Sequence, residues 1–442
     1  MIAASSSSFS ASANEQSSGE ITHRFQSSAE SFPNYYLLGF IEVYRLAIFW
    51  IQKLMESIMR ECIYCGELKA EDMFTMEHVI PQCLGGAYAP EELKTRDVCK
   101  DCNSNLGLFV DASFEKNHLV SNILHLNARA FFDPADPTSL PLCCHGYSDL
   151  ALPGMTDAEV CELWLGPFGE SVYWVRPKDE RLYWYAGGNP RTVKQKKSRA
   201  YFFFTEASKK NLELVLLSFR DAFRRRKVRK ISCTTIEGFD IASIGFSEPD
   251  DLDHERVSYL LQQTRGKQQV HGQMSINVHF DQRFMSKLAL GLSHVLFDKE
   301  VRNSRYSQEL RKALWFRLGD PIPAVRGITT FSSRELPAKE YMSFEHGVTL
   351  TVCPVDDAVG IILSIGRTLT PAVMCAEIRE LNKTQISHLG EGFSLILFDS
   401  LQKCVKLTMP ELVAHNLGMV KHSELSQIEK LASERIRYFQ NL

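Results

Sequence analysis

No stretch of this sequence is both long and apolar enough to cross a membrane. The nearest candidate, residues 35–51, is interrupted by Glu42 and Arg45, whereas a membrane-spanning helix needs roughly 18 or more apolar residues without charges. The N-terminus also lacks the basic region followed by an apolar region that is typical of a secretory signal. We therefore expect a protein of the cytoplasm with no membrane association.

The sequence also has little net charge and no cysteine pattern typical of a disulfide-bonded protein. The 50 basic and 53 acidic residues leave a formal charge of −3. This value neither proves nor excludes a nucleic-acid partner, because such partners contact local charged patches. Twelve cysteines in 442 residues do not make a disulfide scaffold. Four of them form two CxxC pairs, which indicates metal binding in a reducing compartment.

Composition divides the chain into four regions. Residues 1–58 combine a Ser-rich stretch typical of disorder with one expected apolar helix; methionines just before the first CxxC pair leave open whether the working protein needs this extension. Residues 59–125 hold the two CxxC pairs. Residues 126–245 alternate aromatic and polar residues between turns, which predicts a β-rich domain that ends in a basic helix. Residues 246–442 predict a mixed α+β domain.

Hydrophobic spacing predicts the main elements of this last domain. Residues 283–297 have helical spacing, with Phe284, Leu288 and Leu292 on one face. Apolar runs predict strands at 347–355, 359–366 and 393–400, and amphipathic spacing predicts helices at 409–417 and 423–439.

The two CxxC pairs are Cys62–Cys65 and Cys99–Cys102. Four thiolates suit a closed tetrahedral zinc site, and a site without an open position has a structural role. The alternative is four reduced cysteines without metal. The 33 residues between the pairs are more than a simple zinc ribbon contains, so further structure is expected within that gap.

The sequence between the pairs predicts a hairpin followed by a helix. The segment FTMEHVIP (74–81) reads as a strand that carries Glu77 and His78 near its end, where a proline stops it. The segment 97–114 reads as the second CxxC pair entering a helix, with Asn103 at or near the N-cap. Zinc would clamp one end of this unit.

These motifs resemble those of the HNH (ββα-metal) endonuclease family, in its zinc-stapled branch. The resemblance covers about residues 60–115 and rests on three motifs in order: the CxxC pairs, Glu-His-x-x-Pro, and an asparagine directly after the last cysteine. It implies that Glu77 and Asn103 bind a catalytic metal ion and that His78 is the general base.

Each of these roles has a structural alternative. His78 could be an ordinary structural residue of the strand, Glu77 could be an exposed residue in a salt bridge, and Asn103 could be only a helix cap. The segment also departs from the family in one element, because residues 87–98 contain no asparagine to brace the loop that orients the base. Thr95 and Asp97 are the candidates to replace it.

The chemistry fits phosphodiester hydrolysis. A histidine is neutral near pH 7 and can take a proton from water. Ligation by carboxylate and amide oxygens suits Mg²⁺ or Mn²⁺, which would act as a Lewis acid on the phosphate.

Two basic stretches, 191–199 and 218–230, could add affinity for phosphates. The alternative is a pair of solvated helix ends. The candidate nucleic-acid contacts are Lys196, Lys197, Arg224, Arg225, Arg226 and Lys227.

The sequence thus predicts an α+β protein in which a small zinc-stapled ββα-metal module precedes β-rich central and mixed α/β C-terminal regions. The expected function is a metal-dependent endonuclease that acts on DNA, with RNA left open as a substrate. The alternative is a non-catalytic zinc module that binds nucleic acid or protein. Residues 126–442 could also be a sensor or partner-binding region, with the nuclease as its effector.

Overall fold

The chain divides between Ser57 and Ile58 into two units, and the structure describes residues of the second. The computed structural model describes residues 59–178, 197–224, 227–235, 240, 242–265, 271–274, 278–330 and 339–440. The Ser-rich stretch, the apolar helix expected before residue 58 and the aromatic run at 181–188 lie outside these ranges. The mixture of helix and sheet confirms the predicted α+β class.

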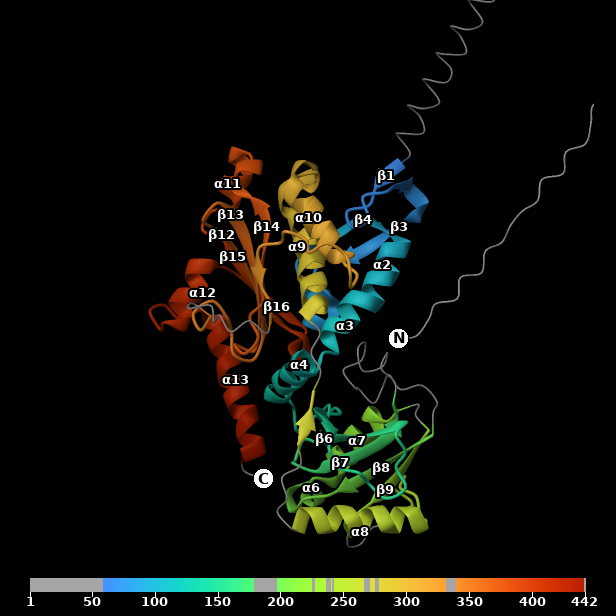
Figure 1. Cartoon of the computed structure of the whole chain (residues 1–442). Coiled ribbons are helices and arrows are strands. Elements are labelled where there is room, and N and C mark those ends of the chain that lie inside the picture. Colours follow the sequence, from blue (N-terminus) through green and yellow to red (C-terminus); the bar gives the residue numbers. More distant parts are fainter. Residues whose placement is uncertain are drawn as a thin grey trace, which may run out of the picture. The chain divides into compact units, whose positions relative to one another are not determined.

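The segment with the CxxC pairs consists of two small antiparallel strand pairs and a run of helix (Figure 1). Strand β1 pairs with β2, and β3 pairs with β4, which places Glu77 opposite Thr95. Helix α2 follows β4 directly and continues through a π-helical turn, η5, into α3. The expected strand, hairpin partner and helix are therefore confirmed. The elements are β1 (Met59–Glu61), β2 (Leu68–Ala70), η1 (Glu71–Met73), β3 (Phe74–His78), η2 (Gln82–Leu84), η3 (Gly86–Tyr88), η4 (Glu91–Leu93), β4 (Lys94–Cys99), α2 (Lys100–Leu106), η5 (Gly107–Asp111), α3 (Ala112–Glu115) and α4 (His118–Ala130).

The central region forms a sheet in the order β10-β5-β6-β7-β8-β9, antiparallel except for the parallel pair β8–β9. Trp174 and Phe202 pack with helix α7 on one face, whereas Val175 and Tyr201 pack with Leu260 of α8 on the other. The edge strand β10 and helix α8 come from beyond residue 245, and the domain boundaries expected from composition stay predictions. The elements are β5 (Cys143–Ser148), β6 (Glu159–Leu165), β7 (Ser171–Pro177), β8 (Ser198–Phe203), α6 (Glu206–Lys210), α7 (Leu212–Ala222), β9 (Val228–Ser232), α8 (Asp251–Arg265) and β10 (Gly272–Gln273).

The C-terminal region forms an antiparallel sheet in the order β11-β14-β13-β12-β15-β16. In β15, Leu395 and Leu397 face the cluster that contains α9, and Ile396 and Phe398 face the cluster that contains α12 and α13. The predicted strands and helices of this region are confirmed. The elements are α9 (Val278–Arg302), α10 (Arg305–Leu314), β11 (Gly327–Ile328), β12 (Val348–Val355), β13 (Ala358–Ile365), β14 (Ala372–Glu377), η7 (Ile378–Glu380), α11 (Lys383–Leu389), β15 (Phe393–Phe398), η8 (Asp399–Leu401), β16 (Lys403–Thr408), α12 (Met409–Asn416) and α13 (Ser423–Gln440).

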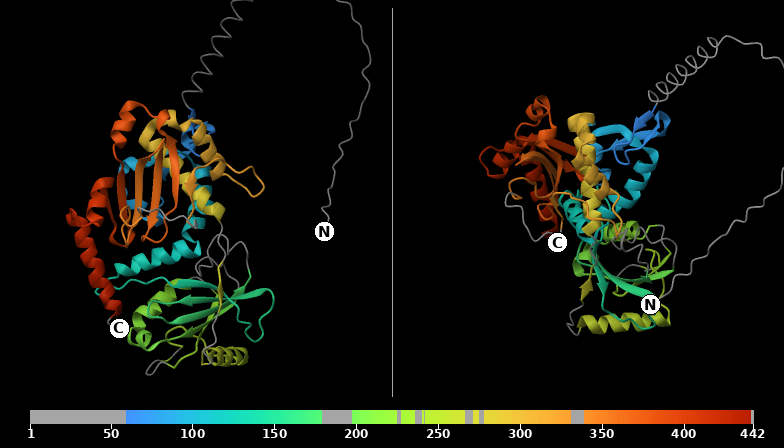
Figure 2. Two further views of the ribbon diagram at one scale, coloured as in Figure 1. Left: turned by 60° about the vertical axis from the view of Figure 1, so that its left-hand side comes forward. Right: turned by 45° about the horizontal axis from the view of Figure 1, so that its top comes forward.

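Helix α9 joins the CxxC segment to the C-terminal sheet in one hydrophobic cluster (Figure 2). The rings of Phe114 and Phe284 stack with centroids 3.8 Å apart. Gly291 lies so close to Val79 that an added Cβ would be 2.7 Å from a valine methyl group. The CxxC segment is therefore held against a long helix that comes from far along the chain.

None of the helices within the described ranges is long and apolar enough to span a membrane.

Candidate functional site

The four cysteines of the CxxC pairs converge on one point. Cys62 and Cys65 lie in the turn between β1 and β2, and Cys99 and Cys102 lie where β4 passes into α2. Their sulfur atoms all lie within 4.8 Å of one another, as a zinc-binding cluster requires. Hydrogen bonding from the Cys102 thiol lowers the pKa of Cys62, whereas burial raises the pKa of Cys65 and the hydrogen bond to Cys62 raises that of Cys102. Metal ligation takes the deprotonated form of each thiol.

The backbone around the cluster fits this geometry. Gly66 adopts a left-handed conformation (φ 73°) directly after Cys65, and its N–H donates to the carbonyl of Cys62 at 2.8 Å. The N–H of Cys99 donates to the Cys62 sulfur at 3.4 Å. Both contacts orient the two CxxC turns toward the same centre.

His78 is the last residue of β3 and is half-buried. Burial lowers the pKa of its imidazole, and the positive charge of the neighbouring Lys94 lowers it further. Among the described residues, no hydrogen bond to the ring is present. A neutral imidazole without a competing partner is suited to accept a proton at neutral pH.

Glu77 points into the protein and is only 5% exposed. Its Oε1 lies 2.8 Å from the Nζ of Lys287 on α9 and accepts a 3.4 Å hydrogen bond from the hydroxyl of Tyr64. The same Lys287 donates to Oδ2 of Asp111 at 2.5 Å. Glu77 is therefore a buried residue in an ion pair, and the alternative of an exposed one is wrong.

The charges of Glu77, Asp111 and Lys287 affect the pKa of each other. Desolvation by burial raises the pKa of Glu77 and of Asp111, and the Lys287 ammonium lowers both pKa values without cancelling that effect. The two acidic partners raise the pKa of Lys287 despite its own burial, so the lysine stays charged. Carboxylate oxygens that hold a cation are the type of ligand that Mg²⁺ and Mn²⁺ accept.

Asn103 lies one turn inside α2, whose N-cap is Cys99. The interpretation of Asn103 as the cap is therefore wrong, because β4 runs directly into the helix at Lys100. Its Nδ2 donates to Oγ1 of Thr75 at 3.0 Å and to the carbonyl of Met76 at 2.9 Å. These bonds fasten the helix to β3 just before Glu77, and the amide oxygen is the atom suited to a cation.

The two candidates for bracing His78 have other partners. The Asp97 carboxylate binds Arg60 and also His294, at 2.8 Å. The Thr95 hydroxyl accepts the backbone N–H of Asp97 at 3.1 Å. Within the described ranges neither side chain hydrogen-bonds His78 itself, and their replacement of the family's loop-bracing asparagine stays a prediction.

Lys287 is the site residue that the sequence reasoning missed. One signal was available, since Lys287 is the only charged residue in the mostly apolar segment FMSKLALGL. Phe284, Lys287, Gly291 and His294 recur at helical spacing and define the face of α9 that contacts the CxxC segment. The carboxylates that Lys287 contacts, however, lie far away in the sequence, so no local pattern identifies them as its partners.

The structure brings the two basic stretches together. Strands β8 and β9 are parallel neighbours, and the N–H of Ser198 donates to the carbonyl of Lys227 at 3.3 Å. Lys197, Lys227 and Arg224 are exposed near this end of the sheet. Lys196, Arg225 and Arg226 lie outside the described residues.

The predicted basic helix needs a correction. Helix α7 ends at Ala222, and residues 228–232 form strand β9. The β-branched residues Val228 and Ile231 favour the strand, and pairing with β8 stabilises it. Arg199 and Arg229 are also unavailable to a ligand, because both bind Asp253.

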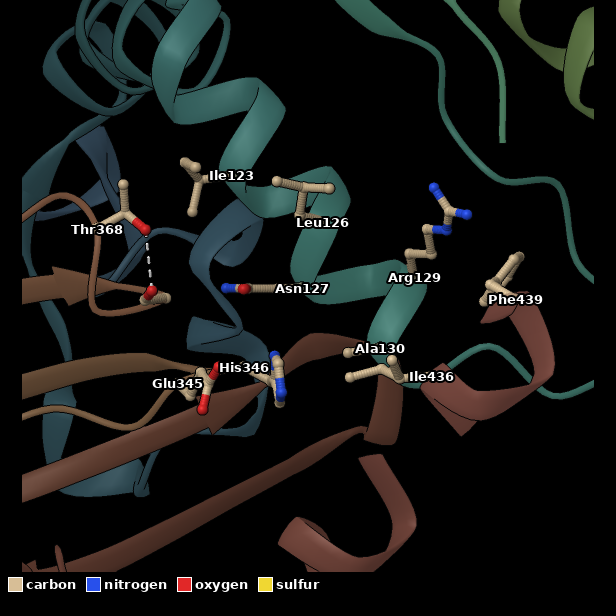
Figure 3. A pocket seen from close by; sticks show the side chains of 11 residues that line it. Ile123, Leu126, Asn127, Arg129, Ala130, Glu345, His346, Thr368, Ile436 and Phe439 are labelled. Carbon is tan, nitrogen blue, oxygen red and sulfur yellow. Dashed lines mark hydrogen bonds between the residues drawn. The ribbon is translucent and has the colours of Figure 1, made fainter. Parts of the chain in front are cut away.

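A cavity of about 430 Å³ lies against α4, apart from the residues discussed so far (Figure 3). Asn127 projects into it from α4 between Thr368 and His346. The wall comes from α4, α13 and the ends of C-terminal strands, which no local sequence pattern connects. None of Glu77, His78 and Asn103 lines it, so it is a separate feature.

Residues 62–119 match the model of a family described as HNH endonuclease. This range begins at the first zinc-binding cysteine and contains Glu77, His78, Asn103 and Asp111, whereas Lys287 lies outside it. The resemblance expected from the sequence is confirmed for this segment. No curated protein and no solved structure matches the chain.

Proposed function

From an HNH endonuclease segment at residues 62–119, we infer that the protein is a metal-dependent endonuclease that hydrolyses phosphodiester bonds of DNA. The observation that carries this proposal is His78 at the end of β3, without a hydrogen-bond partner among the described residues, directly after Glu77, a buried carboxylate that holds a cation. A cytoplasmic location agrees with thiols that must stay reduced to bind zinc.

His78 would act as the general base. It would take a proton from the water that attacks phosphorus. Its lowered pKa keeps the imidazole in the neutral form that this step needs. Its position at the end of β3 is fixed from both sides, by the pairing with Lys94 on β4 and by the Asn103 bonds to Thr75 and Met76.

Glu77 and Asn103 would hold the catalytic divalent ion, Mg²⁺ or Mn²⁺, through their side-chain oxygens. When bound, such an ion supplies Lewis-acid stabilisation of the phosphate and the leaving oxygen. The zinc at Cys62, Cys65, Cys99 and Cys102 would have a structural role, because four thiolates leave no open position.

The basic segments near the starts of β8 and β9 would bind the nucleic-acid backbone. Lys197, Arg224 and Lys227, with Lys196, Arg225 and Arg226 nearby in the sequence, concentrate positive charge in two stretches whose ends meet. Phosphate contacts of this kind give affinity without sequence specificity and weaken as salt rises.

One observation favours the second candidate, a non-catalytic zinc module that binds nucleic acid or protein. Glu77 is engaged by Lys287, so its carboxylate has a structural partner. In that case the segment would serve as a rigid platform fastened to α9.

Plasmid cleavage by His78→Ala separates the two. We expect the zinc-loaded wild type to cut DNA with added Mg²⁺ or Mn²⁺, and the variant to lose about 10²-fold or more of the rate. His254→Ala, an exposed histidine on α8, is the matched control and should cut at the wild-type rate. A folded, zinc-loaded His78→Ala protein that cuts DNA at the wild-type rate would contradict the proposal. Cleavage of RNA but not DNA by the wild type would identify RNA as the substrate.

A further inference from the structure

Lys287 places a cation between two carboxylates of the HNH segment. Its Nζ lies 2.8 Å from Oε1 of Glu77 and 2.5 Å from Oδ2 of Asp111. Lys287 is 2% exposed and Glu77 is 5% exposed. The ring of Tyr64 lies 5.8 Å from the ammonium, and its hydroxyl donates to Glu77.

The two carboxylates come from different elements of the same segment. Glu77 is on β3 and Asp111 ends η5, two turns beyond Asn103. The distances from one Nζ show that a single cation reaches both. Carboxylates held this close repel each other unless a cation lies between them, and in this structure the cation is the Lys287 ammonium.

The cation that fills it comes from another part of the chain. Lys287 is 176 residues from Asp111 in sequence and lies outside the matched range of 62–119. Phe284 and Gly291 fix α9 against the segment on either side of it. The helix therefore delivers the ammonium to a defined position.

A divalent ion and the Lys287 ammonium cannot both occupy the space between these oxygens, because of their volume and their charge. We propose that Asp111 joins Glu77 and Asn103 as a ligand of the divalent ion, and that Lys287 occupies the space between the two carboxylates in competition with the metal. Asp111 is then a metal ligand, and metal binding requires the lysine side chain to leave. The α9 contact thus holds the nuclease in a latent state. This inference rests on the proposed function in taking Glu77 as a metal ligand.

Binding of Mn²⁺ to the zinc-loaded protein, followed by electron paramagnetic resonance of the free ion, tests the competition without any cleavage. We expect Lys287→Met to bind Mn²⁺ more tightly than the wild type by on the order of tenfold or more, a normal size for coupling between two exclusive ligands. Lys312→Met, an exposed lysine on α10, should bind like the wild type. Adding Asp111→Asn or Glu77→Gln to Lys287→Met should abolish the gain.

Zinc content and thermal unfolding of each variant must match the wild type before affinities are compared. Should Lys287→Met fail to fold, Lys287→Gln retains a donor without the charge and takes its place. An affinity for Mn²⁺ that is unchanged in the folded neutral variant would overturn the proposal, as would a gain that survives Asp111→Asn.

The wild type alone offers a second test. A small acylating reagent modifies accessible lysines, and Lys287 should resist it until Mn²⁺ displaces the side chain. We expect Mn²⁺ to raise its modification several-fold, measured by mass spectrometry, while Lys312 reacts equally in both conditions. Continued protection of Lys287 at Mn²⁺ concentrations that support cleavage or measured binding would overturn the proposal.

The outcomes separate this inference from the proposed function. Tighter Mn²⁺ binding by Lys287→Met, without cleavage of any nucleic acid, would retain the cation site and reject the nuclease. Cleavage that depends on His78, together with an unchanged Mn²⁺ affinity in Lys287→Met, would retain the nuclease and reject the competition.

Discussion

The side-chain amide of Asn103, one turn into α2, donates a hydrogen bond to the backbone carbonyl of Met76 on β3, 2.9 Å away. A second bond from the same nitrogen reaches the hydroxyl of Thr75. Because Met76 directly precedes Glu77, the helix and the strand that carries the candidate catalytic pair are joined at this point. The amide nitrogen of Asn103 donates the hydrogen bonds that hold the helix to the strand, and the oxygen of the same amide is the proposed metal ligand.

Two substitutions of Asn103 separate these two roles. Asn103→Ala removes both donor and acceptor, and Asn103→Asp removes only the donor. We expect both to lower the free energy of unfolding by about 1–2 kcal/mol, since two hydrogen bonds are lost. Mn²⁺ affinity should fall in Asn103→Ala and persist in Asn103→Asp. Asn105→Ala, an exposed residue of the same helix, should change neither; equal Mn²⁺ affinity in all variants would remove Asn103 from the ligands.

Loss of zinc should destabilise the segment, because the four clustered sulfurs join the β1–β2 turn to the start of α2. Structural zinc contributes about 10–16 kcal/mol of binding free energy in small zinc domains. We expect Cys102→Ser to lose zinc and to lower the thermal midpoint. Cys404→Ser, a cysteine outside the cluster, should keep both zinc content and midpoint close to the wild type. A Cys102→Ser protein with a wild-type midpoint would contradict a structural role.

The close packing of α9 against Val79 can be tested by a substitution at Gly291. An alanine Cβ there would lie 2.7 Å from a Val79 methyl group and 3.1 Å from the Tyr64 hydroxyl. Overpacking costs about 1–3 kcal/mol, which exceeds the gain of about 1 kcal/mol in helix propensity. Gly291→Ala should therefore be less stable in urea unfolding.

Val79→Ala supplies the matched test, because it removes the methyl groups that the new Cβ would meet. In a double-mutant cycle the cost of Gly291→Ala should shrink or change sign when residue 79 is alanine. Additive costs would show that Val79 and residue 291 do not interact.

Much of this architecture follows from local patterns. The CxxC spacing, the Glu-His pair on a strand and the helix after β4 each reflect chemistry or periodicity within a few residues, and the structure has them in the expected order, with the helix beginning earlier, at Lys100. The strands β12, β13 and β15 have long apolar runs, and these also appear where predicted.

The remainder depends on contacts between distant segments. The basic stretch at 224–230 continues a helical pattern, yet it leaves the helix because β8 offers a pairing partner for β9. The burial of Glu77 likewise depends on Lys287, which lies on a helix far along the chain. Local patterns in a single sequence do not show which distant segment β9 or Glu77 will contact.

The buried carboxyl of Glu170 should make the free energy of unfolding fall as pH rises. Its side chain is fully buried, and Oε2 accepts the backbone N–H of Phe168 at 2.9 Å. Oε1 has no hydrogen-bond partner among the described residues. Burial raises the pKa of this carboxyl to about 7, with the charge of Arg129 acting weakly against it.

The folded state therefore binds this proton more tightly than the unfolded state, where the pKa is near 4.3. The stabilisation by the protonated form is complete below that value and is lost as pH rises toward about 7. Between pH 4.5 and 8 the loss should reach on the order of 2–3 kcal/mol.

Urea unfolding of Glu170→Gln at several pH values measures this contribution directly. Glutamine has the same shape without the titration, so the variant should gain stability relative to the wild type as pH rises from 4.5 to 8. Glu213→Gln, an exposed residue on α7, should follow the wild type at every pH. Parallel curves for the wild type and Glu170→Gln would show that the Glu170 carboxyl is ionised in the folded protein throughout, and that buried solvent or a counter-charge stabilises it.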